Sequence, residues 1–231
     1  MKTVLISGAS RGLGNLLARE YAKDGYQVFA GARDTACDGI ARLQEDFGPQ
    51  IVPVALDVSS GESVRQAAAQ VAAACDGLDL LINNAGIHGS KDEFEGYDVE
   101  LVPVVFNTNT AGPLRMASAC LNLLRARKGT VLNITSDQGS ITRMEWHDDL
   151  GYRISKAGVN MLTKILSNLL VPEGMLAYCV NPGWINTDMG GPDAVGDAAE
   201  TAAAIKKLLD SKIARRSPIL YSNIDGSEIP W

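Results

Sequence analysis

The chain has 231 residues, of which 46% are hydrophobic and 21% are charged, which is enough apolar material for one compact domain with a sizeable core. Its net charge of −6 and pI near 5.0 argue against a surface for nucleic acid or anionic membrane. The N-terminal apolar stretch is too short for a signal segment, and no apolar run reaches the length of a membrane span. We therefore expect a cytoplasmic protein with a small-molecule partner.

Apolar runs rich in β-formers alternate with helical patterns along the chain. Strands are predicted at residues 3–7, 27–32, 51–56, 78–83, 130–135, 177–180 and 218–221. Helices are predicted at residues 13–23, 39–47, 60–74, 101–126, 150–170 and 198–209. Because such alternation implies right-handed crossovers, the sequence predicts a single-domain α/β fold. Its core is expected to be a Rossmann-like, doubly wound parallel sheet of seven strands with helices on both faces.

The four cysteines and two histidines suggest neither a disulfide framework nor a metal site. The cysteines are widely spaced and form no C-x-x-C pair, as expected for free thiols in a reducing compartment. The sequence has only two histidines, His88 and His147, and they lie far apart. We therefore expect no metal.

A glycine-rich turn follows the first predicted strand. Gly8, Gly12 and Gly14 have the spacing G-x-x-x-G-x-G and lead directly into a helix. Glycine lets the backbone approach a pyrophosphate closely, and the helix N-terminus offers oriented N–H groups and partial positive charge. The turn is therefore a candidate dinucleotide site, although glycine-rich turns are common.

The same turn also matches the G-x-S-x-G nucleophile elbow of α/β-hydrolases, with Ser10 at the nucleophile position. That fold needs an acidic residue and then a histidine downstream of the serine. No histidine occurs in the last third of this sequence. A hydrolase therefore stays a minor alternative.

Tyr152 and Lys156 lie four residues apart on a predicted helix, so they share one face. A phenol beside an ammonium is a proton-transfer pair, because a fixed cation favours the phenolate and lowers the tyrosine pKa. The apolar residues of this helix recur on another face, at Leu150, Ile154, Ala157, Met161, Leu162, Ile165 and Leu169. We therefore expect Tyr152 and Lys156 to lie outside the core.

Five motifs occur in the order and at the separations of one family: the glycine turn, Asn83-Asn84-Ala85-Gly86, Ser136 after a strand, Tyr152-x-x-x-Lys156, and Asn181-Pro182-Gly183. In this the chain resembles the short-chain dehydrogenase/reductase family. Asn109-Thr110-Ala111-Gly112, the segment after Gly183 and the C-terminal Asp225–Trp231 region (residues 225–231) resemble the C-factor and sniffer-type carbonyl reductase branch.

The resemblance implies a catalytic set. Tyr152 would be the general acid in carbonyl reduction, and Ser136 would donate a hydrogen bond to the substrate oxygen. Lys156 would activate Tyr152 and bind the cofactor ribose, and Asn109 would hold a water in the proton relay. Elementary chemistry agrees, since hydride transfer to a carbonyl leaves negative charge on oxygen that hydroxyl donors stabilise. Two neighbours stay open as alternatives for Ser136 and Asn109, namely Ser140 and Asn107.

The end of the second strand bears on the choice of cofactor. Enzymes that use NAD place an acidic residue there for the ribose hydroxyls, whereas a 2′-phosphate needs basic groups. Here Ala32 takes the acidic position and Arg33 follows, with Arg11 of the glycine turn as a second candidate cation. The sequence favours NADP(H); Asp34 would be the ribose ligand if the cofactor were NAD.

The resemblance extends the site to further residues. The implied cofactor contacts are Gly8, Ser10, Arg11, Gly12, Leu13, Gly14, Arg33, Asp57, Val58, Asn84, Ala85, Gly86, Tyr152, Lys156, Pro182, Gly183, Trp184, Ile185 and Thr187. The candidate substrate contacts are Ser136, Gln138, Trp146, Trp184 and Met189. For Asp57 a helix N-cap is an equally good interpretation, and Asn84 could be only a turn residue.

The sequence as a whole predicts an NADP(H)-dependent oxidoreductase. It would transfer a hydride between nicotinamide and a carbonyl or secondary alcohol of a small hydrophobic substrate. Residues 1–130 would form the cofactor half and residues 131–231 the substrate and catalytic half of one domain. The alternatives are a cofactor-binding regulatory or C-factor-like signalling protein, and a dehydratase or epimerase on the same fold. The protein would be a monomer, or a homo-oligomer paired through its long helices.

Overall fold

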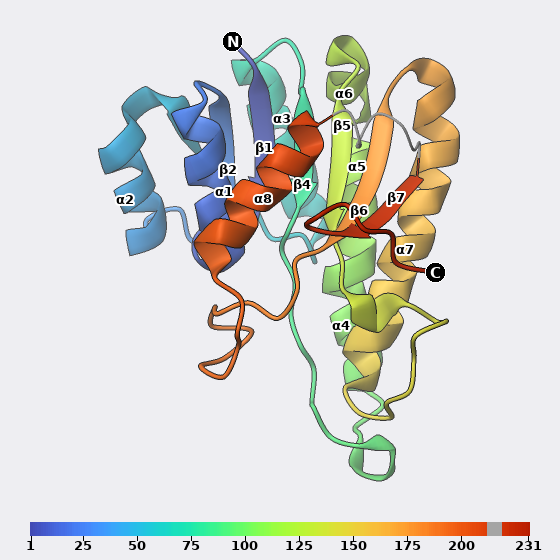
Figure 1. Ribbon diagram of the computed structural model, residues 1–231. Helices are drawn as coiled ribbons and strands as arrows, with labels where there is room; N and C mark the ends of the chain where they lie inside the picture. Colours follow the sequence, from blue (N-terminus) through green and yellow to red (C-terminus); the bar gives the residue numbers. More distant parts are fainter. Residues whose placement is uncertain (212–218) are drawn as a thin grey trace.

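One parallel sheet of seven strands runs through the computed structural model, which describes residues 1–211 and 219–231 (Figure 1). The strand order is β3-β2-β1-β4-β5-β6-β7, and every neighbouring pair is parallel. The strands are β1 (Thr3–Ser7), β2 (Gln27–Ala32), β3 (Ile51–Ala55), β4 (Leu80–Asn83), β5 (Thr130–Ile134), β6 (Leu176–Asn181) and β7 (Ile219–Asn223). The predicted doubly wound sheet is confirmed. Residue 218, the predicted start of the last strand, lies outside the described residues.

Helices cover both faces of the sheet, each burying apolar side chains against it. On one face lie α1 (Gly12–Lys23), α2 (Asp38–Phe47) and α8 (Ala198–Asp210), the last crossing in front of the sheet in Figure 1. On the other face lie α3 (Gly61–Ala74), α5 (Gly112–Ala119), α6 (Leu121–Arg127) and α7 (Leu150–Leu170). A short helix, α4 (Leu101–Phe106), packs against α7.

The helical segment predicted over residues 101–126 is confirmed, but it is not one regular α-helix. The segment instead consists of α4, a π-helical turn at Asn107–Ala111, α5 and α6. The π turn buries the Asn109 and Thr110 side chains toward α7, where the Thr110 hydroxyl donates to the Ser155 carbonyl at 2.8 Å. A widened turn in a helix re-aims side chains in this way and is frequent at functional sites.

The expected orientation of α7 is also wrong. Ile154, Met161 and Ile165 of its apolar stripe are exposed, whereas Tyr152 and Lys156 are buried. The buried side of the helix is mixed, because Ser155, Asn160 and Thr163 lie there with Val159, Leu162 and Leu166. Polar groups can be buried on this side because the structure supplies them with hydrogen-bond partners.

The chain crosses from β3 at the sheet edge to β4 in its centre, so the strand order reverses between β1 and β4. In such sheets a crevice forms at the carboxyl ends of the two strands where the order reverses. The glycine turn follows β1, and Asn84 to Gly86 follow β4, so both motifs meet at this crevice. Among the helices of the described part, none is long and apolar enough to cross a membrane.

Candidate active site

The glycine turn is packed too tightly for any larger residue. Gly8 and Gly12 have φ values of +70° and +54°, which L side chains rarely adopt. A Cβ on Gly14 would lie 2.2 Å from the Gly8 carbonyl oxygen. The N-terminus of α1 has no side-chain cap, so its N–H groups and partial positive charge face the crevice without a capping side chain. The turn therefore fits the pyrophosphate of a dinucleotide.

Asn84 fastens the end of β4 to this turn. Its side-chain amide donates to the carbonyls of Ser7 and Gly8, at 3.0 and 3.2 Å, and its backbone N–H donates to the Ser7 hydroxyl at 3.0 Å. The Asn84 amide is therefore engaged by the protein itself. A cofactor would meet the backbone of Ala85 and Gly86 next to it.

The candidate cofactor residues at the ends of β2 and β3 differ in their contacts. Asp34 accepts the Ala36 N–H at 2.9 Å, so its carboxylate closes a local turn. Arg33 is exposed, and its charge helps to lower the pKa of Asp57, although hydrogen bonds from Ser59 contribute most to that shift. Asp57 is not the N-cap of α3, because Ser60 takes that position.

The segment after β6 closes over the glycine turn. Arg11 forms an exposed ion pair with Asp188 at 3.0 Å, and a Cβ on Gly12 would touch the Thr187 side chain at 3.5 Å. A cavity of about 430 Å³ lies between this segment, the glycine turn, α1 and α2. Its lining residues include Ser10, Arg11, Gly12, Asn15, Arg42 and Asn186. Arg11 therefore lies at the mouth of the crevice.

The rest of this segment begins with a turn that Asn181 stabilises by accepting the Gly183 N–H at 3.1 Å. Gly183 has a φ of +79°. Ile185 is buried, and Trp184 is exposed with its indole N–H donating to the Gly190 carbonyl at 2.8 Å. Of the predicted contacts in this segment, Thr187 lies against the glycine turn, beside Gly12.

Tyr152, Lys156 and Ser136 come together where β5 ends and α7 begins. The Lys156 ammonium lies 5.3 Å from the centre of the Tyr152 ring and donates to the Ile134 carbonyl at 2.9 Å. Ser136 is hydrogen-bonded to the Tyr152 phenol. Ser140, the alternative to Ser136, is fully buried and donates to the Pro230 carbonyl instead.

The expected lowering of the Tyr152 pKa by Lys156 is not found. Burial raises the pKa of Tyr152 well above its ordinary value, and the carboxylates of Asp149 and Asp137 raise it further, whereas the hydrogen bond from Ser136 lowers it. Burial also lowers the pKa of Lys156 to about 8. Desolvation therefore outweighs the attraction between these two groups and shifts each pKa in the direction of the neutral form, although Lys156 still carries its proton below about pH 8.

Asn109 is held by the backbone after β4. Its amide accepts the Ile87 N–H at 2.8 Å and donates to the Ile87 carbonyl at 2.9 Å and to the Ser155 hydroxyl at 3.0 Å. The side-chain amide is thus fully engaged with protein. Asn107, the alternative, lies away from this site and bonds Arg115 and the Ser59 carbonyl.

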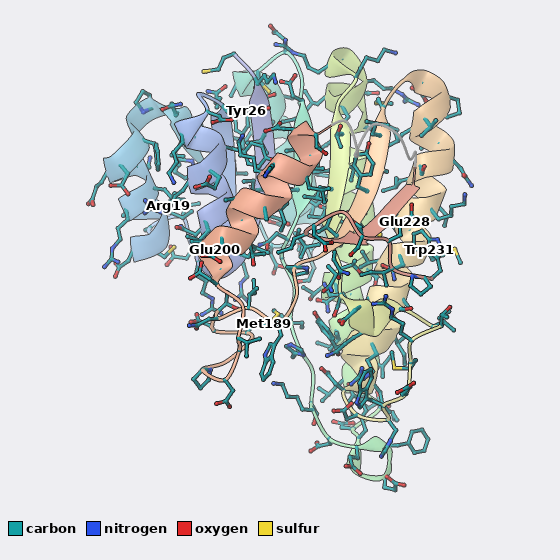
Figure 2. The ribbon with its side chains drawn as sticks, in the orientation of Figure 1. Arg19, Tyr26, Met189, Glu200, Glu228 and Trp231 are labelled. Carbon is teal, nitrogen blue, oxygen red and sulfur yellow. The ribbon has the colours of Figure 1, made fainter. Side chains whose placement is uncertain are left out.

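Most of the candidate substrate residues are exposed side chains in loops. Trp146 is exposed and stacks on the Arg153 guanidinium, 5.5 Å from the ring centre. Met189 lies in the loop between β6 and α8. Figure 2 shows it well separated from Trp231, which lies near α7. Gln138 has a buried side-chain oxygen with no partner in the described part of the chain.

Two residues near Tyr152 were missed by the sequence analysis. His88 stacks on the Tyr152 ring and contacts Asp149. The sequence position of His88 could have indicated it, because His88 comes two residues after the Asn84-Ala85-Gly86 motif at the end of β4. Asp149 carries no comparable signal, since only the fold brings its loop to His88.

The doubly wound sheet, the glycine turn and the Tyr152–Lys156 pair define a dinucleotide-dependent oxidoreductase. Residues 2–195 match the sequence model of the short chain dehydrogenase family, and the chain belongs to that family.

Comparison with individual proteins supports the predicted branch. The C-signal protein of Myxococcus xanthus is 36% identical over 159 residues, which is 68% of this chain and 95% of that protein. The structure of NADPH-bound carbonyl reductase from chicken fatty liver superposes with a TM-score of 0.91 at 30% identity, covering 100% and 99% of the two chains. The carbonyl reductase Sniffer of D. melanogaster gives a TM-score of 0.92 at 27% identity, with complete coverage of both chains. The resemblance to the C-factor and sniffer-type branch is confirmed.

Proposed function

We propose that the protein is an NADPH-dependent carbonyl reductase. The observation that carries the proposal is the convergence of Ser136, Tyr152 and Lys156 beside a glycine turn with no room for a Cβ. The turn fits a dinucleotide and the three side chains fit a carbonyl oxygen. The similarity to solved carbonyl reductases supports the same reading.

The dinucleotide supplies the hydride when it is bound. Ser136 and Tyr152 then hold the substrate oxygen with hydroxyl donors, which stabilise the negative charge that develops on it. The raised pKa of Tyr152 keeps the phenol protonated, so that it can deliver its proton to this oxygen. The Lys156 ammonium, on the same helix face, stabilises the phenolate that remains and offers a donor to the ribose.

A relay returns the proton to Tyr152. The Asn109 amide is engaged by Ile87 and Ser155, so we assign the water ligand to the Asn109 backbone carbonyl. Its position in a π-helical turn favours this role, since such a turn interrupts the regular ladder of carbonyl acceptors.

The preference for NADP(H) follows from the β2 end. Ala32 offers no carboxylate, Asp34 is engaged with the Ala36 N–H, and Arg33 is exposed where a 2′-phosphate would lie. NADPH binding in the chicken liver enzyme is consistent with this choice. A guanidinium can bind the phosphate in bidentate fashion.

The substrate we propose is a small hydrophobic ketone, aldehyde or quinone. Trp146, Trp184 and Met189, which lie in the loops that follow β5 and β6, provide exposed apolar surface for such a substrate. The test is a panel of such carbonyls, including para-nitrobenzaldehyde and phenanthrenequinone, assayed by loss of NADPH absorbance. Turnover that requires NADPH and disappears with Tyr152→Phe would support the proposal, and a panel without turnover would contradict it.

A signalling role is the second candidate, because the C-signal protein is similar over most of its length. A pure binding protein would have no use for a proton donor. A cellular signalling assay of the Tyr152→Phe variant and the unmodified protein separates the two functions. A signalling activity that needs no turnover should be kept in the variant, whereas one that depends on carbonyl reduction should be lost.

We propose that a second copy of the chain covers the exposed apolar side of α7. Met161, Ile165 and Leu169 are exposed there, and Val104 and Leu114 are exposed on α4 and α5. α4 packs against α7, and exposed apolar patches commonly mark protein interfaces.

A further inference from the structure

The His88 imidazole lies flat against the ring of the predicted proton donor. The ring centres of His88 and Tyr152 are 4.2 Å apart, and the planes are inclined by 24°. His88 Nδ1 lies 2.8 Å from Asp149 Oδ2, which is hydrogen-bond distance. The His88 side chain is 24% exposed and that of Asp149 only 5%. A buried carboxylate therefore orients an imidazole that touches Tyr152.

Independent contacts hold both members of this pair. Ile87, next to His88, uses its backbone N–H and carbonyl on the Asn109 amide. The Asp149 N–H donates to the Asp92 carbonyl at 3.2 Å, and the Gly151 N–H donates to the Tyr97 hydroxyl at 3.0 Å. The segment after β4 and the start of α7 are thus joined at several points, and the stacked contact lies between them.

Asp149 adopts a left-handed backbone conformation, which is uncommon for residues other than glycine, although aspartate reaches it more readily than most. Its φ and ψ of 49° and 42° lie in the left-handed region, and its Oδ1 is buried with no partner in the described part of the chain. Such backbone strain persists only where surrounding contacts impose it, and it clusters at active sites. A buried carboxylate with a single hydrogen-bond partner is an unfavourable choice for stability alone.

The carboxylate acts on Tyr152 electrostatically. The charged groups that face the phenol are Asp137 after β5, Asp149 before α7 and Lys156 on α7, with His88 across the ring. After burial and the opposing hydrogen bond from Ser136, Asp149 is the next cause of the raised Tyr152 pKa. The His88 N–H that bonds Asp149 disperses that negative charge.

We propose that His88 and Asp149 form a positioning pair that holds the Tyr152 ring in the orientation from which its phenol donates the proton. The inference rests on the proposed function, in which Tyr152 donates the proton. His88 acts through Tyr152 and does not itself transfer the proton to substrate.

Two substitutions separate the two contacts of His88. His88→Phe keeps a ring against Tyr152 and removes the bond to Asp149, whereas His88→Gln keeps a donor and removes the ring. We expect each to lower kcat for NADPH reduction of para-nitrobenzaldehyde by about 5- to 50-fold, with KM and the NADPH Kd within about twofold. His147, the other histidine, is exposed at 3.6 Å from Glu93, and His147→Phe should leave all three constants unchanged. Normal kcat in both His88 variants would overturn the proposal.

A double-substitution cycle tests whether His88 acts through Tyr152. In the Tyr152→Phe background, His88→Phe should cause no further loss, because the group that it positions has gone. If the losses in kcat from the two substitutions multiplied in the double variant, His88 would have a separate structural role and the proposal would be overturned. If Tyr152→Phe itself keeps normal turnover, the proposed function fails and this inference fails with it. Loss in Tyr152→Phe together with normal His88 variants refutes the positioning pair alone.

The charge contribution has its own signature. Asp149→Asn keeps hydrogen-bonding capacity, and asparagine tolerates the left-handed conformation. Removing the negative charge should lower the Tyr152 pKa. The shift is measured on the phenol itself, by the rise of tyrosinate absorbance at alkaline pH with Tyr152→Phe as the blank, because Lys156 titrates at lower pH and would also affect kcat. Tyr152 should ionise at a pH lower by about half a unit or more in Asp149→Asn, and an unchanged titration would overturn the electrostatic role of Asp149. Circular dichroism of each variant verifies the fold.

Discussion

The glycine turn after β1 and the start of α7 both lie at the carboxyl edge of the sheet, yet they are constructed differently. The turn presents backbone: two glycines with positive φ, a third with no space for a Cβ, and an uncapped helix N-terminus. The start of α7 presents side chains, Tyr152 and Lys156, whose protonation depends on burial and on groups from several loops. A backbone site is specified by local residue types, whereas a side-chain site depends on what the whole fold brings near it.

The largest expected effect is at the side-chain site. Tyr152→Phe should lower turnover by roughly two to four decades, because the phenol delivers the proton, and it should leave NADPH binding nearly unchanged. Steady-state kinetics with para-nitrobenzaldehyde measure the turnover, and fluorescence titration with NADPH measures the affinity for the cofactor. A variant that keeps turnover would mean that another group is the acid.

Gly14→Ala tests the backbone site. Its Cβ would lie 2.2 Å from the Gly8 carbonyl oxygen and 2.4 Å from the Asn84 amide nitrogen, so the turn must shift. We expect at least a tenfold weaker NADPH Kd and a stability loss of about 1–3 kcal/mol, by analogy with overpacked cores. Gly61→Ala is the control, since a Cβ there meets only the end of the Arg65 side chain at 3.5 Å. Equal behaviour of the two variants would contradict the tight turn.

Replacing Ala32 by Asp and Arg33 by Ser should reverse the cofactor preference. A carboxylate would lie beside the 2′-phosphate and its cation would be lost, at a cost of several kcal/mol, given about 1.5–3 kcal/mol for a hydrogen bond to a charged group. NADH should bind as well or better. The measurement is the ratio of kcat/KM for NADPH over NADH in both proteins. An unmodified protein that already prefers NADH would refute the assignment.

Lys156→Met should stabilise the cofactor-free protein while removing turnover. Burial lowers the Lys156 pKa to about 8, so below that pH the folded chain holds a buried charge. For the unmodified protein this group makes stability rise with pH from about 8 to the ordinary lysine value, and the variant should lack that rise. At pH 7 we expect a gain of roughly 1–3 kcal/mol in urea unfolding. Lys164→Met, on the exposed side of the same helix, should change little.

The smallest effect on chemistry is expected on the outer side of α7. Met161 and Ile165 are 62% and 56% exposed. Changing both to Glu should prevent association, because two charges would enter the apolar contact between copies. Sedimentation should give a lower mass, with turnover per chain within about twofold. A monomeric unmodified protein would refute the proposed pairing.

The same contrast explains how far the sequence could predict this molecule. The strand–helix alternation and the local glycine spacing predicted the sheet and the dinucleotide turn, because both depend on neighbouring residues. The orientation of α7 could not be predicted from its apolar stripe, since Ile154, Met161 and Ile165 face outward while Tyr152 and Lys156 are buried. The predicted shift of the Tyr152 pKa had the wrong sign, because desolvation depends on how distant segments pack around the phenol.

The π turn and the His88–Asp149 contact were missed for a related reason. The periodicity of residues 101–126 is continuous, so nothing local marks the widened turn at Asn109. Asp149 lies 61 positions from His88, and only the joined loops bring them together. The roles of the individual site residues stay predictions that the proposed variants test.

The bond from Asn84 to the carbonyls of Ser7 and Gly8 has a consequence for folding. It joins β1 and β4 across 77 positions of sequence, at the line where the strand order reverses. Closing so long a loop is slow, so this junction should form late in folding. A dinucleotide lying across the same junction binds only when both strands are paired, and at saturation it raises the free energy of unfolding of the whole chain. The cell's supply of reduced cofactor would then govern how long the protein survives as well as how fast it works.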